Sequence, residues 1–197
     1  MVALDSFTNE QRELLVALPY RVGLWVSESD KTGGDESDEA EMQALETIVT
    51  GFAEDFLKSE FIQRMMEETV SRKDSWKNWQ DHLDEVPAEC KQALDLLSER
   101  LDHREIASFK ITVMDIAVFV ALAYRELDDD GNMGIKLKAY IRLMMQKIRS
   151  MVTGSEVQTM SQLLNISESE QRALNTLQKV LDAGRPIRRN DNTAESA

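Results

Sequence analysis

Cysteine, proline and glycine are scarce in this chain of 197 residues, which has one cysteine, three prolines and eight glycines. The single cysteine, Cys90, cannot form an internal disulfide, so a reducing compartment is expected. Few prolines and glycines favour helices over sheets, and 42% hydrophobic residues suffice for a core. We therefore predict an all-α protein, with a single helical domain over residues 1–184 and a disordered tail over 185–197.

Positive charge and long apolar runs are lacking as well. The chain has 23 Lys and Arg residues against 36 Asp and Glu residues, a formal net charge of -13. Nucleic-acid binding depends on Lys and Arg that neutralise phosphates, so nucleic acid is excluded as a main partner. The longest uninterrupted apolar run, 116–123, is too short to span a bilayer. The first residues contain no export signal, and we expect a cytoplasmic protein.

Apolar residues recur at helical spacing along most of the chain. A capping box at Thr8 and Gln11 predicts a helix that runs to about residue 27. Pro19 lies inside this helix and predicts either a kink or a division into two short helices. Further helices are expected to begin near Ser37 or Asp38, Ser59, Pro87 and Ser167. Segment 102–126 is apolar on nearly every side, so we place it in the centre of a bundle of about seven or eight helices, covered all round.

Acidic residues are concentrated in residues 27–41, here called the acidic segment, around the pair Gly33-Gly34. They are Glu28, Asp30, Asp35, Glu36, Asp38, Glu39 and Glu41. A second acidic turn covers residues 128–132, with the sequence DDDGN. Carboxylate oxygens are the ligands that Ca²⁺ and Mg²⁺ prefer. The candidate ligands for such an ion are Asp30, Asp35, Asp38, Glu41, Asp128 and Asp130.

The acidic segment has two other interpretations. It is also suited to a basic protein partner. Alternatively, it is a solvated loop whose acids favour the positive end of the following helix. Neither acidic stretch has the spacing of an EF-hand, because the sixth position counted from Asp30 is Asp35 where that motif requires glycine.

Residues 134–153, here called the basic segment, reverse the local charge. The segment contains no acid, and its five basic residues are Lys136, Lys138, Arg142, Lys147 and Arg149. They flank apolar residues at helical spacing, namely Leu137, Tyr140, Ile141, Met144, Ile148 and Met151. One interpretation is a peripheral contact with an anionic membrane or with a protein partner. The other is that the apolar residues are buried in the bundle while the basic residues relieve the repulsion between the acids.

Catalytic patterns are absent from the sequence. Neither His82 nor His103 follows a glutamate by three residues, so the paired motif of di-iron bundles is missing. No glycine-rich phosphate loop or nucleophile motif is present. Asp115 lies among apolar residues and would be the best candidate for an enzyme with a buried carboxylate. We favour a non-enzymatic binding or adaptor protein, and we expect Trp76 and Trp79 to anchor a short helix to the core, although a partly exposed pair would suit a binding hot spot.

Three short stretches together resemble the TerB-like family of small helical bacterial proteins, which includes tellurite-resistance TerB proteins and the N-terminal domains of some DnaJ-like co-chaperones. They are SESDKTGGDESDEAE at 27–41, YRELDDDGN at 124–132 and LLNISESE at 163–170. The resemblance implies a helical, non-enzymatic domain with a role in stress response or in membrane-linked complexes, and divalent cations at the acidic turns. This chain departs from the family pattern because its first loop lacks an Asp-Gly pair and no glutamate follows Gly131 directly.

Overall fold

The structure, a computed structural model, describes residues 3–29, 35–54, 59–126 and 166–183, with the backbone alone at 35–41, 54 and 123–126. Every regular element in these ranges is a helix, which confirms the all-α class. The α-helices are α1 (Asn9–Ser27), α2 (Asp35–Glu54), α3 (Glu60–Ser71), α4 (Val86–Ser98), α5 (His103–Glu126) and α8 (Glu168–Ala183). Three short 3₁₀ helices are η1 (Leu4–Ser6), η2 (Lys73–Trp79) and η3 (Leu83–Glu85).

The helix starts follow the capping residues that the sequence predicts. At α1, Gln11 N donates to Thr8 Oγ1 over 3.3 Å and Thr8 N donates to Gln11 Oε1 over 3.1 Å. Ser59 Oγ accepts a hydrogen bond from Ile62 N at the start of α3. A second capping box, of Ser167 and Glu170, opens α8, and Pro87 lies in the first turn of α4. These local predictions are confirmed.

Two predicted helix features differ from the structure. α1 is one continuous helix through Pro19, so the division into two short helices is wrong. The stretch around Pro19 is buried on almost every side, and tertiary packing offsets the hydrogen bond that proline cannot donate. α2 begins at Asp35, before the predicted caps Ser37 and Asp38, because part of the acidic segment is helical rather than loop.

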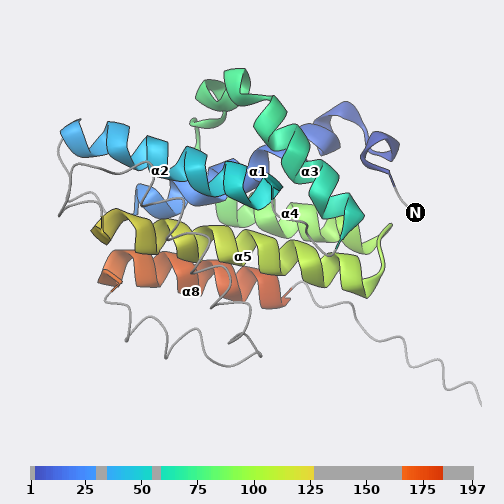
Figure 1. Cartoon of the computed structure of the whole chain (residues 1–197). Coiled ribbons are helices and arrows are strands. Elements are labelled where there is room, and N and C mark those ends of the chain that lie inside the picture. The colour runs from blue at the N-terminus through green and yellow to red at the C-terminus, as the bar shows by residue number, and fades with distance from the viewer. Residues whose placement is uncertain (1–2, 30–34, 55–58, 127–165, 184–197) are drawn as a thin grey trace, which may run out of the picture.

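α5 is the central helix of the bundle, as predicted. It packs against α1, α2, α3, α4 and α8 (Figure 1). The prediction that it is covered all round is wrong, because the side chain of Ile111 is 54% exposed. One contiguous core runs from Leu4 in η1 to Leu181 in α8. The predicted tail, 185–197, lies outside the described residues.

Gly23 in α1 faces side chains of both α2 and α5. A β-carbon at this position would lie 2.3 Å from Leu45 Cδ1 and 3.3 Å from Val120 Cγ2. The nearest atom is the end of the Leu45 side chain, so a larger residue at this position would have to displace that side chain, and glycine leaves room for it. The contact lies one turn before the end of α1.

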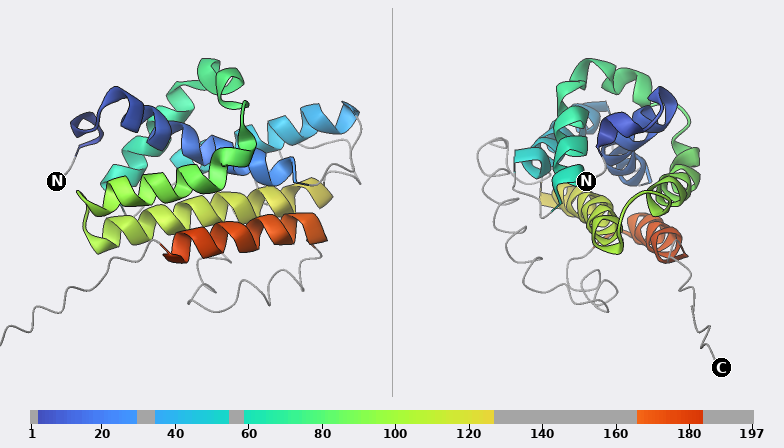
Figure 2. Two further views of the ribbon diagram at one scale, coloured as in Figure 1. Left: turned by 180° about the vertical axis from the view of Figure 1, so that it is seen from behind. Right: turned by 90° about the vertical axis from the view of Figure 1, so that its right-hand side faces the viewer.

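The helix directions bring four helix termini to one end of the bundle. α1 and α5 run in the same direction, and α2 and α8 run in the opposite direction, as the views in Figures 1 and 2 show. The C-terminal ends of α1 and α5 therefore lie near the N-terminal ends of α2 and α8. We call this the shared end. The opposite end holds the C-termini of α4 and α8 and the start of α5 (Figure 2).

Candidate functional site

Most of the predicted site residues lie at or beyond the limits of the described structure. Asp30, Asp128 and Asp130 lie outside the described residues. Asp35, Asp38 and Glu41 lie in the first two turns of α2, where the structure gives the backbone path. The basic residues of the 134–153 segment, Lys136, Lys138, Arg142, Lys147 and Arg149, also lie outside the described residues. The described helices nevertheless fix where the chain enters these stretches.

The chain enters both acidic stretches at the shared end. α1 ends at Ser27 and α2 begins at Asp35, so the acidic segment joins two helix termini there. α5 ends at Glu126, two residues before the second acidic turn, at the same end (Figure 1). Negative charges that gather at one end of a molecule add their potentials.

Tyr20 links three elements close to the acidic segment. Its hydroxyl donates a hydrogen bond to the sulfur of Met42 in α2 over 3.3 Å and accepts one from Gln80 Nε2 over 3.1 Å. Burial raises the pKa of Tyr20 above its ordinary value, the bond from Gln80 lowers it in part, and the charge of Glu28 raises it further. The carboxylate of Glu28, the C-cap of α1, is therefore close enough to act on this hydroxyl. The base of the acidic segment is held on a fixed scaffold.

Arg21 is a buried cation that the sequence analysis did not single out. Its side chain is 9% exposed and Nε lies 2.8 Å from Glu89 Oε2 in α4. Nη1 donates to the carbonyl oxygens of Trp79 and Asp81 over 2.6 and 2.8 Å, and Nη2 donates to that of His82 over 3.1 Å. His82 adopts a left-handed conformation, with a φ of 54°. Arg21 thus holds the turn between η2 and η3 against α1.

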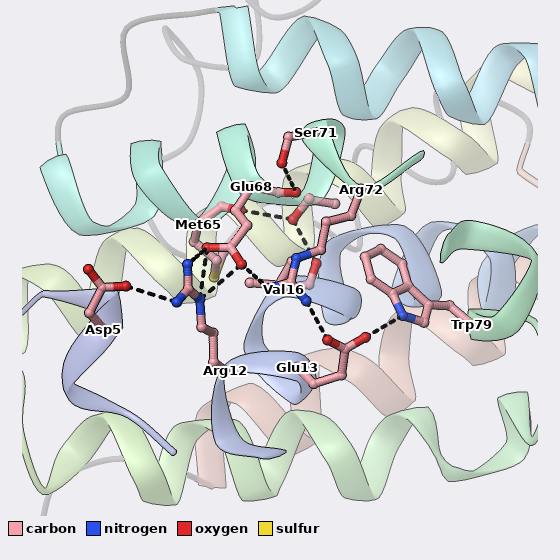
Figure 3. A network of polar contacts seen from close by, with 10 residues as sticks. Asp5, Arg12, Glu13, Val16, Met65, Glu68, Ser71, Arg72 and Trp79 are labelled. Carbon is pink, nitrogen blue, oxygen red and sulfur yellow. Dashed lines mark hydrogen bonds and ion pairs between the residues drawn. The ribbon is translucent and has the colours of Figure 1, made fainter. Parts of the chain in front are cut away.

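A network of charged side chains joins α1 to α3 and η2 (Figure 3). Arg12 makes a bidentate contact with Glu68, at 2.9 Å from Nε to Oε1 and 2.7 Å from Nη2 to Oε2. Arg72 pairs with both Glu68 and Glu13. Glu13 also accepts a hydrogen bond of 2.7 Å from the indole of Trp79. Because these charges are paired with one another, we assign the network to stability rather than to ligand binding.

Trp76 and Trp79 are core residues. Their side chains are 7% and 6% exposed. Trp76 stacks on Tyr20 with ring centroids 4.4 Å apart, and its indole donates to the carbonyl oxygen of Thr69 over 3.0 Å. The prediction that both tryptophans anchor a short helix is confirmed, and an exposed hot spot formed by this pair is excluded.

Two carboxylates of the described helices, Asp115 and Glu170, lie partly or fully out of solvent. Asp115, the candidate for a buried carboxylate, is half-buried and takes part in a polar interaction. Glu170 is 2% exposed, but it accepts hydrogen bonds from the backbone and hydroxyl of Ser167 as part of a capping box. Within the described ranges, no three His, Cys, Asp or Glu side chains are grouped to hold a metal ion. The enzyme alternative stays a prediction.

Cys90 is fully buried in α4. Burial, with a smaller effect of Glu89, raises the pKa of its thiol to about 12. Since iodoacetamide reacts with thiolate, we expect no labelling of the native protein at pH 8 over a time in which the denatured protein is labelled completely. Mass spectrometry measures both. Equal labelling of native and denatured protein would contradict the burial of this side chain.

Comparison with known proteins adds no relative. No family model, curated protein or solved structure matches this chain. The resemblance to the TerB-like family therefore stays a prediction. No helix in the described part of the chain is long and apolar enough to cross a membrane.

Proposed function

We propose that this chain is a non-enzymatic helical binding protein that takes up a divalent cation, Ca²⁺ or Mg²⁺, at the shared end of its bundle. The ligands come from the acidic segment, with Asp30, Asp35, Asp38 and Glu41, and from the second acidic turn, with Asp128 and Asp130. The biological role that fits is the one expected of a TerB-like protein, namely an adaptor in a bacterial stress response or in complex assembly in the cytoplasm.

The observation that carries this proposal is the common position of the termini of α1, α2 and α5 (Figure 2). Two acidic stretches that are about a hundred residues apart in sequence start from the same end of one packed core. If the two acidic stretches lay at opposite ends of the bundle, the repulsion between them would be weak and they could not bind the same ion. At one end their mutual repulsion is unfavourable, and a divalent cation between them removes that cost.

The scaffold under the acidic segment supports the same proposal. At Gly23 side chains of α2 and α5 pack close to α1, and the hydroxyl of Tyr20 links α1 to α2 and to the end of η2. Lys73 in η2 pairs with Glu46 in α2 over 2.5 Å. A site on helices that are held in this way needs little reorganisation when an ion binds, which favours affinity.

Thermal unfolding with and without added ions tests the proposal. After EDTA treatment, a saturating concentration of the correct ion, at 100 times its Kd, stabilises the folded state by about 2.7 kcal/mol. For a chain of this length the expected rise in melting temperature is about 5–10 °C. Ca²⁺, Mg²⁺, Mn²⁺ and Zn²⁺ are compared one at a time, because the oxygen-rich ligand set predicts a response to Ca²⁺ or Mg²⁺ and a weaker response to Zn²⁺.

A pair of matched variants separates a site from a general charge effect. Asp30→Asn with Asp35→Asn removes two candidate ligands and should abolish the rise. Glu99→Gln with Asp182→Asn removes the same charge from exposed acids at the opposite end of the bundle and should leave the rise intact. If no ion changes the melting temperature, or if both variants lose the rise equally, the cation site is contradicted. The acidic segment is then better explained as a binding site for a basic protein partner.

A further inference from the structure

The methionines of the described helices differ in how far solvent reaches them. Four of the ten methionines of the chain, Met42, Met65, Met66 and Met114, have described side chains. Met65 and Met66 in α3 are 0% exposed, and Met114 in α5 is 8% exposed. Met42 in α2 is half-buried and packs against the core. Of these four thioethers, that of Met42 is therefore the most accessible to a dissolved small molecule.

The sulfur of Met42 is also a contact between helices. It accepts the hydrogen bond of the Tyr20 hydroxyl over 3.3 Å, and Tyr20 is 0% exposed. The same hydroxyl accepts a hydrogen bond from Gln80, and the ring of Tyr20 stacks on that of Trp76. A side chain that solvent partly reaches thus joins α2 to a buried residue of α1 and, through that residue, to η2 and its end.

Oxidation of this thioether by a hydroperoxide changes the contact. With hydrogen peroxide, one oxygen forms a bond to a lone pair of the sulfur while the O–O bond breaks. The proton of the transferred oxygen passes to the leaving hydroxide, which departs as water. The sulfur loses two electrons, the peroxide gains them, and an apolar, flexible side chain becomes a polar sulfoxide.

Neither position of the new oxygen preserves the contact between Met42 and Tyr20. An O–H···O hydrogen bond needs about 2.7 Å between its two oxygen atoms. The hydroxyl oxygen and the sulfur are only 3.3 Å apart, so an oxygen between them displaces either α2 or the ring of Tyr20. An oxygen on the other lone pair withdraws electron density from the sulfur, and the thioether is already a weak acceptor. In both cases the buried hydroxyl loses the acceptor that it has in α2.

We propose that Met42 is a reversible oxidation site, at which a hydroperoxide weakens the attachment of the first half of α2 to α1 and η2. Methionine sulfoxide reductases remove this oxygen, so the change can be reversed. The site responds to oxidants although the one cysteine of the chain, Cys90, is fully buried. This inference does not depend on cation binding, since it concerns a thioether and a phenol and no carboxylate.

Peptide mapping of the native, full chain in dilute hydrogen peroxide measures the rate of oxidation at each methionine. We expect Met42 to be oxidised at least ten times faster than Met65 and Met66, whose side chains solvent does not reach. In the chain denatured with guanidinium chloride the three rates should be similar, because all three thioethers are then exposed. Equal rates at the three positions in the native chain would overturn the proposal.

Thermal unfolding shows whether the oxidation acts through Tyr20. We expect the melting temperature of wild type to fall by about 3 °C or more after oxidation and to recover after treatment with methionine sulfoxide reductases. Met42→Leu keeps the side chain apolar and similar in volume, so its melting temperature should fall less than one third as far. The other methionines are common to both proteins, and their effects cancel in this comparison.

Tyr20→Phe removes the hydroxyl and keeps the ring. Oxidation should lower its melting temperature less than half as far as that of wild type, because no hydrogen bond to the sulfur is left to lose. An equal fall in wild type and Met42→Leu would place the effect at other methionines and overturn the proposal. An equal fall in wild type and Tyr20→Phe would overturn the part assigned to the Tyr20 hydroxyl.

Discussion

Replacing Arg21 with leucine is expected to lower the free energy of unfolding by about 3–5 kcal/mol, since removal of one partner of a buried ion pair leaves the other charge unpaired. The guanidinium satisfies Glu89 and three backbone carbonyl oxygens, those of Trp79, Asp81 and His82. Leucine has no hydrogen-bond donor in its side chain, so it satisfies none of these acceptors. Urea unfolding followed by circular dichroism measures the change.

Two control substitutions test whether the loss of stability in Arg21→Leu comes from the hydrogen bonds of the Arg21 guanidinium. Arg21→Lys keeps the charge but cannot reach all four acceptors, so we expect a smaller but clear loss. Arg64→Met removes an exposed arginine of α3, whose ion pair with Glu60 is 3.7 Å long, and should change stability by less than about 0.5 kcal/mol. If Arg21→Leu is as mild as Arg64→Met, the burial and bonding of Arg21 described above are wrong.

Replacing Trp76 with alanine is expected to cost about 3–5 kcal/mol, the usual range for loss of a large aromatic side chain from a core. Trp76 is 7% exposed, stacks on Tyr20 and bonds to the carbonyl oxygen of Thr69. Its removal opens a cavity between α1 and η2 and leaves that carbonyl oxygen without its donor. The Tyr20 ring, which lies near the acidic segment, loses its support at the same time.

Trp76→Phe is the matched control, because it keeps an aromatic ring while it removes the indole N–H. We expect it to lose less than half as much stability as Trp76→Ala. Thermal unfolding of the three proteins in the same buffer gives the order. Equal losses in Trp76→Phe and Trp76→Ala would assign the effect to the hydrogen bond alone and contradict the role of the stacked ring.

Local signals in the sequence were sufficient for the starts of α1, α3, α4 and α8, although not for that of α2. Thr8 with Gln11 and Ser167 with Glu170 form capping boxes because the interaction involves residues three positions apart. The apolar face of α4, including Cys90, follows from helical periodicity in the same way. Both kinds of signal involve residues that are close in sequence, so they can be recognised without knowledge of the tertiary fold.

Features that depend on distant residues could not be read in this way. Pro19 is tolerated inside α1 because neighbouring helices bury that helix, which the local sequence does not show. Arg21 resembles an ordinary surface cation in the sequence, and its partners are more than fifty residues away. The one available signal was its position among buried apolar residues of α1, where an unpaired charge would be costly.

The candidate site depends both on local sequence signals and on the packing of distant residues. The acidic segment and the second acidic turn are visible in the sequence as clusters of carboxylates. Their common position depends on the directions of α1, α2 and α5, which follow from the packing of the helices against one another and not from either cluster. The sequence therefore identified the residues of the proposed cation site, and the fold supplies the reason for considering the two clusters together.

Direct titration of Ca²⁺, and in a second series of Mg²⁺, into the full, EDTA-treated chain by calorimetry tests the central claim, that the two acidic stretches at the shared end form one cation site. Wild type is compared with Asp30→Asn plus Asp35→Asn, with Asp128→Asn plus Asp130→Asn, and with all four changes together. The account predicts saturable binding to wild type and a loss of at least tenfold in affinity in either double variant. In the quadruple variant it predicts a loss that is smaller than the sum of the losses in the two double variants. Absence of binding to wild type, or independent effects of the two double variants that simply add, would contradict it.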